Sequence, residues 1–307
     1  MNIKVKQSLK TIYNLLRNSV TQFINDDAIK LSASLSYYTI FSLPPLIIII
    51  ITLVGYFFGV EAIRGEVYGQ IKDFVGNNAA VQIQETIKNI QLTRDTPLAT
   101  TIGIIALAFG ATGVFNEVQT SINLIWGIKI KPAKGIIKLI LNRLISFSMI
   151  IVMGFLLLVS LLINTLLDIL SLHLQNYFSH ITVSVFYVLN VLLVFSVITV
   201  IFMTVFKVLP DGKVHWKDSL IGAAFTALLF MVGKFAISEY LGNSSITSVY
   251  GAAGSVIVIL LWVYYSSIIL YFGAEFTQVY ATTYGKKIVP NNYSVKFVMK
   301  EVESTGS

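Results

Sequence analysis

Long runs without charge constrain this chain more than any other feature. Residues 181–206 contain no charged side chain, and neither do residues 250–274. Each run exceeds the roughly 20 residues that a helix needs to cross the hydrocarbon core of a bilayer. Over the whole chain 55% of residues are hydrophobic and 12% are charged, whereas about a quarter are charged in an ordinary soluble domain. The composition therefore predicts an all-α integral membrane protein.

The apolar runs predict a bundle of six transmembrane helices. The first, from Ala28 to Gly59, would extend about 48 Å as one straight helix, well beyond the core of a bilayer. Pro44 and Pro45 lie within it, so we expect a kinked or broken helix whose first half carries a polar stripe of Ser32, Ser36 and Thr39. The other spans are predicted at 97–117, 143–168, 181–206, 218–240 and 250–280.

Two segments outside the spans are amphipathic. Residues 4–24 place Val5, Leu9, Ile12, Leu16, Val20 and Phe23 at helical spacing among basic residues, which is typical of a helix lying at the membrane surface. Asp26 and Asp27 then suit helix capping. Residues 60–96 contain two similar stretches and are predicted to lie on the outer face. The predicted organisation is a surface helix at 1–27, a membrane domain at 28–281 and a tail at 282–307.

The distribution of Lys and Arg predicts the orientation. Seventeen of these residues lie in segments on one side of the predicted spans, four lie on the other side, and Lys234 lies within a span. Because positively charged loops stay in the cytoplasm, both termini are expected there. The same positions explain the net charge of +7 without nucleic acid as a partner.

Several motifs resemble a known family. They are Ser36-Tyr37-Tyr38-Thr39 with Ser42-Leu43-Pro44, Asn123-Leu124-Ile125-Trp126-Gly127, Pro210-Asp211-Gly212-Lys213 with Trp216, and Tyr250-Gly251-Ala252-Ala253-Gly254 with Gly273-Ala274-Glu275. Together they resemble the YihY/BrkB family of bacterial inner-membrane proteins over roughly residues 28–281. The resemblance implies a multi-pass protein of the bacterial cytoplasmic membrane with six helices. The family has also carried the labels ribonuclease BN, regarded as a misattribution, and virulence factor.

Polar residues at membrane depth are the best candidates for function, because each costs roughly 2.5–3.5 kcal/mol at a helix centre on insertion scales. Glu275 is the first candidate, since it shares one helix face with Ser267, Tyr271 and Gln278. This face suits a bundle interior or a hydrated groove. The alternative is that Glu275 lies near the cytoplasmic end and pairs with basic loop residues.

Four further residues complete the predicted polar path. Lys234, in the middle of the fifth span, suits pairing with a carboxylate or an anionic headgroup, and the alternative is snorkelling toward an interface. Glu117 and Asn116 end the second span on a polar tract that either lines a cavity or protrudes into water. Ser36 belongs to the stripe on the first helix.

Signatures of an enzyme, a metal site or a cofactor site are not found in the sequence. The chain has no cysteine, and its histidines, His173, His180 and His215, lie in predicted loops without ligand spacing. A nuclease normally needs clustered carboxylates or an acid–base pair. The sequence shows neither, so it does not support the ribonuclease label.

Three functions remain open from the sequence. A transporter or lipid translocator would use the broken first helix, the polar face of the last helix and Lys234 as a path across the bilayer. A non-transporting scaffold for envelope assembly would use the polar residues as contacts between helices. A membrane-embedded enzyme ranks last. Membrane lipids are the expected partners, and the sequence leaves the oligomeric state open.

Overall fold

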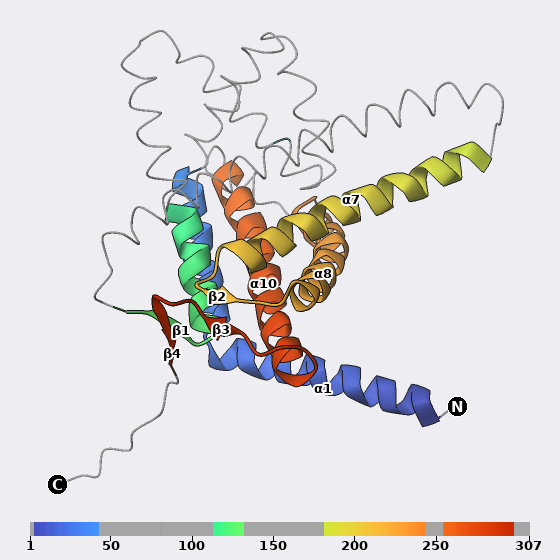
Figure 1. Cartoon of the computed structure of the whole chain (residues 1–307). Helices are drawn as coiled ribbons and strands as arrows, with labels where there is room; N and C mark the ends of the chain where they lie inside the picture. Colours follow the sequence, from blue (N-terminus) through green and yellow to red (C-terminus); the bar gives the residue numbers. More distant parts are fainter. Residues whose placement is uncertain (1–2, 43–80, 82–112, 132–180, 243–253, 298–307) are drawn as a thin grey trace, which may run out of the picture.

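The computed structural model describes residues 3–42, 81, 113–131, 181–242 and 254–297. Helices dominate this part of the chain (Figure 1). Two helical segments without a label occupy residues 28–42 and 113–125. The labelled helices are α1 (Ile3–Asn25), α7 (Ile181–Val208), α8 (Trp216–Gly242) and α10 (Gly254–Thr283).

Among the described residues, three helices are long and apolar enough to cross a membrane. The qualifying stretches are Val188–Val208, Trp216–Leu241 and Val256–Thr283, which correspond to the predicted spans 181–206, 218–240 and 250–280. The shortest has 21 residues, or about 32 Å at a rise of 1.5 Å per residue, which matches the hydrocarbon core. The predicted break at Pro44 and Pro45 and the span 143–168 lie outside the described residues, as do most of segment 60–96 and of span 97–117.

Small residues let α8 and α10 approach closely. A Cβ atom on Gly222 of α8 would overlap the side chain of Thr277 on α10, and one on Gly273 of α10 would overlap Thr226 of α8. Each threonine also donates its hydroxyl to the carbonyl of the glycine four residues earlier in its own helix, both at 2.7 Å. The contact is reciprocal, so it fixes the level at which the two helices face each other.

The first helix lies across one end of α10 (Figure 1). Leu15 packs in a buried cluster with Phe276 and Val279, and the ring of Phe23 meets that of Phe272 at 5.7 Å. The face against the protein is therefore Leu15, Ser19 and Phe23. The predicted apolar face is wider than this contact, and its members Ile12 and Val20 are exposed by 53% and 46%.

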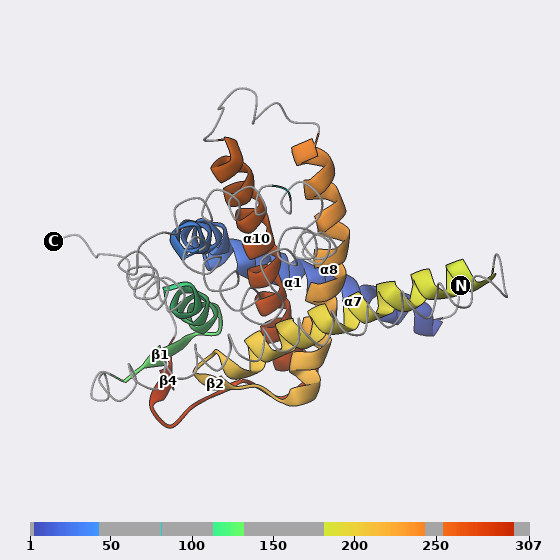
Figure 2. The same cartoon turned by 90° about the horizontal axis from the view of Figure 1, so that it is seen from above.

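The described residues include four short strands, which the predicted all-α class did not contain. Strand β1 (Ile128–Ile130) pairs antiparallel with β4 (Ser294–Lys296), and β2 (Gly212–Lys213) pairs antiparallel with β3 (Val289–Pro290). Strands of two or three residues are too short for an alternating pattern to reveal. They bring part of the segment predicted as a tail back against β1 and the α7–α8 connection (Figure 2).

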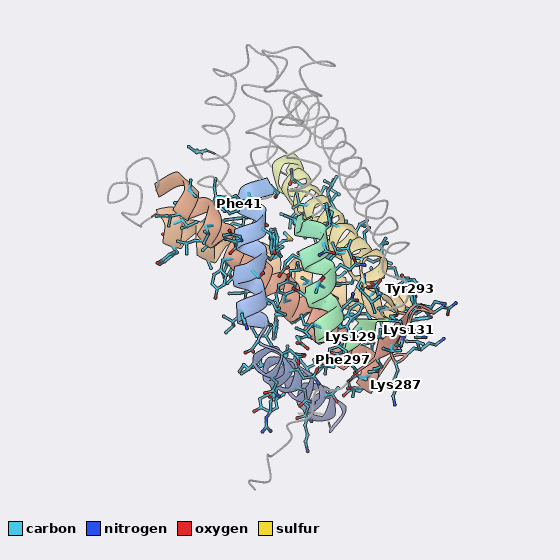
Figure 3. All side chains as sticks on the ribbon, turned by 90° about the vertical axis from the view of Figure 1, so that its left-hand side faces the viewer. Phe41, Lys129, Lys131, Lys287, Tyr293 and Phe297 are labelled. Carbon is cyan, nitrogen blue, oxygen red and sulfur yellow. The ribbon has the colours of Figure 1, made fainter. Side chains whose placement is uncertain are left out.

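The strands mark a basic end of the molecule. In Figure 3, Lys129, Lys131 and Lys287 lie near the strands, far from Phe41 at the other end of helix 28–42. All three lysines are exposed. The two acidic residues of the α7–α8 connection and the first turn of α8, Asp211 and Asp218, are buried. The exposed charge on the strands and their connections is therefore positive.

Candidate functional site

One face of α10 is polar and buried. Ser267, Tyr271 and Glu275 follow one another at intervals of four residues, and Gln278 comes three residues later. Tyr271 and Glu275 are completely buried and Ser267 is 3% exposed, whereas Gln278 is half-buried. Ser267 donates to the carbonyl of Val263 at 2.7 Å, within its own helix. The structure thus brings the four α10 candidates together on an inward face.

Helix 113–125 covers part of this face through the tryptophan that follows it. Gly127 ends the helix in a left-handed conformation, with φ of 61°, which glycine adopts without strain. Trp126, just before it, is 1% exposed and donates its indole N–H to the carbonyl of Ala274 at 3.1 Å. That hydrogen bond ties the helix to the residue directly before Glu275.

The carboxyl group of Glu275 faces that of Asp26, at the junction between α1 and helix 28–42. Neither oxygen of Glu275 has a hydrogen-bond partner, and within the described ranges neither carboxyl forms an ion pair with Lys or Arg. Two ionised carboxylates can only accept hydrogen bonds, so they cannot satisfy each other. Glu275 therefore faces another acid. The sequence analysis had offered pairing with a basic loop residue as the alternative.

Asp26 also differs from its predicted role as a helix cap. Asp27 has a positive φ of 52°, and its backbone carbonyl accepts the N–H of Leu31 at 3.1 Å. Within the described ranges no backbone N–H donates to either carboxyl group. The left-handed turn at Asp27 starts helix 28–42 through the backbone alone, which leaves the Asp26 side chain to face α10.

Burial is the main cause that raises the pKa of Asp26 above its ordinary value of 3.8, and the negative charge of Asp27 adds to it. The facing carboxyl group of Glu275 acts in the opposite direction. Desolvation disfavours the ionised form of a carboxyl group, as does a second acid nearby. The junction therefore favours a neutral Asp26 more than open water does.

Three more buried polar atoms near this face have no hydrogen-bond partner. They are the Ser121 hydroxyl, the Tyr271 hydroxyl and the side-chain carbonyl of Gln278. Ser121 and Glu117, both on helix 113–125, lie near the Tyr271 hydroxyl. Since nearly all buried polar groups in proteins are paired, this concentration of exceptions makes the face a candidate site. We call Asp26, Ser121, Tyr271, Glu275 and Gln278 the carboxyl cluster.

A second buried acid, Asp211, has the opposite environment. Asn123 donates its side-chain N–H to the Asp211 carboxylate at 2.7 Å and accepts the Asp211 backbone N–H at 2.8 Å. Gln119 donates to the same carboxylate at 3.3 Å and to the carbonyl of Leu209 at 2.8 Å. Ser294 of β4 donates to the Asp211 carbonyl at 2.8 Å. We call Asp211, Asn123, Gln119 and Ser294 the Asp211 network.

Asn123 and Asp211 both belong to motifs named in the sequence analysis, but the hydrogen bonds between them were not predicted. They are 88 residues apart, and no local spacing links them. The available signal was a polar side chain beside an apolar tract in each motif. The same holds for Asp218, which accepts the backbone N–H of Lys286 at 2.9 Å and holds the chain after α10.

The other predicted path residues lie elsewhere. Lys234 is half-buried, with its ammonium group 5.5 Å from the ring of Phe235. Its neighbour Gly233 packs against Tyr265 and Ile269, whereas Gly222 packs against Thr277. Because Glu275 lies close to Thr277, Lys234 is about two turns of α10 away from it along the bundle. The structure does not bring these two charges together.

Ser36 and Asn116 are not members of the carboxyl cluster. Ser36 is 3% exposed and donates to the carbonyl of Ala33 at 2.8 Å, within its own helix. Asn116 is exposed, and Glu117 is half-buried. Among the described residues, no group of three or more His, Cys, Asp or Glu side chains is placed to hold a metal ion.

Comparison with known proteins identifies the family to which this chain belongs. The family described as virulence factor BrkB matches residues 19–295, which include every residue of the carboxyl cluster and of the Asp211 network. The chain belongs to the BrkB family.

Relatives of this BrkB-family chain carry the name UPF0761 membrane protein. One from Psychrobacter sp. (strain PRwf-1) is 26% identical over 86% of this chain and 48% of its own length. Others come from Pseudoalteromonas translucida, 26% identical over 90% of this chain and 91% of its own length, and from Alcanivorax borkumensis, 28% identical over 88% and 60%. The chain thus spans about half of the first relative and most of the second. No solved structure matches it.

Three of the motifs that resemble the BrkB family meet at these two sites. Trp126 and Asn123, from one motif, bind Ala274 and Asp211 from the two others. Tyr38, from a fourth, lies 3.5 Å from the position that a Cβ on Gly113 would take. This BrkB-family chain is a membrane protein whose motif residues join helix 113–125, the α7–α8 connection and α10.

Proposed function

We propose that this chain is a transporter or lipid translocator of the bacterial cytoplasmic membrane, with a polar path along the inward face of α10. The observation that carries the proposal is Glu275. It is completely buried on a helix long enough to span a membrane, and neither of its oxygens has a hydrogen-bond partner. A buried acid costs several kcal/mol at such a depth. Ionisable residues retained inside membranes line substrate or ion pathways in many transporters.

The proposal includes a six-helix topology with both termini in the cytoplasm. The exposed lysines of the strands and their connections support this orientation, since they gather at one end of the described helices and positive loops remain cytoplasmic. The exposed apolar residues Ile12 and Val20 of α1 support membrane lipids as its neighbours. We propose no enzymatic activity and no nucleic-acid partner.

A non-transporting scaffold is the second candidate, favoured by a specific observation. Many polar side chains of the described helices bond only to their own backbone, as Ser32, Thr226 and Thr277 do at 2.7–2.8 Å. Such residues need no hydrated path. The Asp211 network likewise binds helix 113–125 to the strands with no unpaired group that would suggest a ligand.

The deciding experiment is flux in liposomes that contain the purified full-length chain, measured with a labelled phospholipid and with small solutes. Glu275→Gln keeps the shape of the side chain and removes its charge, so lost flux would place the path on α10. Glu239→Gln is the matched control, because Glu239 is an exposed glutamate on α8. Equal flux in all three proteins would remove Glu275 from the path. Folded wild-type protein that moves nothing would favour the scaffold.

A further inference from the structure

The carboxyl cluster holds more hydrogen-bond acceptors than donors. Asp26 and Glu275 contribute two carboxyl groups, and Gln278 adds a side-chain carbonyl oxygen. The only donors in the cluster that are not backbone groups are the amide of Gln278 and the hydroxyls of Ser121 and Tyr271. Neither hydroxyl has a partner, and no donor reaches either oxygen of Glu275. Ionised as a pair, the facing acids would leave this excess uncompensated in a buried place.

We propose that Asp26 and Glu275 together form a proton-binding site that holds one shared proton at neutral pH. One proton converts one acid into a donor, and its O–H can then donate to the facing carboxylate. A proton needs no further ligands. A bound metal ion would need a larger set, and the described residues contain no group of three His, Cys, Asp or Glu side chains that could supply it.

The charged groups around the pair do not offer an alternative to the proton. On the α1 side, Asp27 follows Asp26 directly and acts on it as a second negative charge. On helix 113–125, Glu117 acts on Tyr271, one turn of α10 before Glu275. Both are acids. Within the described ranges no Lys or Arg forms an ion pair with Asp26 or Glu275.

The site also has a mechanical consequence. Asp26 lies just after α1, which packs on α10 through Leu15 and Phe23. With the proton bound, a hydrogen bond fastens this junction to Glu275. Without it, two like charges face each other and favour separation of the junction from α10. The proton-binding site does not depend on transport, although its release would give the proposed path a coupling ion.

Infrared spectroscopy of the full-length chain in lipid tests the site, because the C=O stretch of a neutral carboxylic acid is distinct from that of a carboxylate. In wild type we expect a neutral-acid band at neutral pH that disappears at alkaline pH and shifts in heavy water. Glu275→Gln removes it, since its amide can donate to Asp26. Asp27→Asn, a matched change at the exposed neighbour, keeps it.

Asp26→Asn provides a second variant that does not remove Glu275. The new amide N–H can donate to the Glu275 carboxylate, so the band of Glu275 should disappear at a lower pH than the wild-type band does. A wild-type spectrum without the band at neutral pH would overturn the proposal. A spectral change on adding sodium would then assign the pair to a metal cation. The band present without any lipid or solute flux would keep the proton site and refute only the transport function.

Discussion

Two buried acids of this protein lie in opposite environments. Asp211 is 1% exposed and receives side-chain hydrogen bonds from Asn123 and Gln119, while its backbone binds Asn123 and Ser294. Glu275 is completely buried and receives none. Burial of a charge is tolerated where donors compensate it and is costly where they do not. The comparison indicates that Asp211 holds the fold together, whereas the unpaired Glu275 is the residue for which we propose a function.

The largest expected effect tests Asp211, the acid whose carboxylate receives hydrogen bonds. Asp211→Asn replaces one carboxylate oxygen with an NH₂ group, which then faces the donor of either Asn123 or Gln119. Donors left unpaired in a buried place cost about 1–3 kcal/mol. We expect the free energy of unfolding in detergent to fall by that amount. If Asp211→Asn did not lower the free energy of unfolding, the hydrogen bonds of the Asp211 network would not contribute to stability.

The next largest effect tests whether the hydrogen bond of Trp126, beside Glu275, stabilises the fold as the Asp211 network does. Trp126→Phe removes the hydrogen bond to the Ala274 carbonyl and leaves a smaller side chain in a buried site. The expected loss is about 1–2 kcal/mol of unfolding free energy, from one hydrogen bond and a small cavity.

Trp216→Phe is the control for this substitution, because Trp216 is 51% exposed at the start of α8. It should change the unfolding free energy by less than about 0.5 kcal/mol, as surface substitutions do. Equal effects at both tryptophans would show that Trp126 does not fasten helix 113–125 to α10.

Glu275→Gln is the matched counterpart of Asp211→Asn and should have the opposite sign. The same replacement of oxygen by NH₂ here supplies a permanent donor toward Asp26, in place of the proton that we propose the pair shares. Unfolding free energy at neutral pH should stay constant or rise by up to about 1 kcal/mol. A loss as large as that of Asp211→Asn would remove the difference between the two acids and make Glu275 a structural residue.

The sequence predicted the helices far better than the contacts between them. Apolar runs long enough to cross a bilayer leave few alternatives, so α7, α8 and α10 lie within a few residues of their predicted bounds. The inward face of α10 followed from spacing alone, because Ser267, Tyr271 and Glu275 recur every four residues. Such periodic signals are local, and one helix is enough to read them.

Contacts between distant segments had no such signal. Asp26 was predicted as a helix cap because acids often occupy that position, yet the left-handed backbone at Asp27 starts the next helix and leaves the Asp26 side chain to face Glu275. The short strands were missed because two or three residues show no alternation. Lys234 was grouped with Glu275 by depth, and the reciprocal contacts of Gly222 and Gly273 set them about two turns apart.

The smallest expected effect is the dependence of stability on pH through Asp26. Its pKa in the folded protein is raised above 3.8, by burial first and then by Asp27. Between 3.8 and that raised pKa the folded protein binds more protons than the unfolded chain, so stability falls as pH rises through this window. The effect is small because Asp26 is only half-buried.

Unfolding curves across this range should show a shallower fall in Asp26→Asn than in wild type. Asp27→Asn should retain most of the fall, because burial raises the pKa more than the charge of Asp27 does. An identical fall in wild type and Asp26→Asn would place the titration on another group and separate Asp26 from the carboxyl cluster.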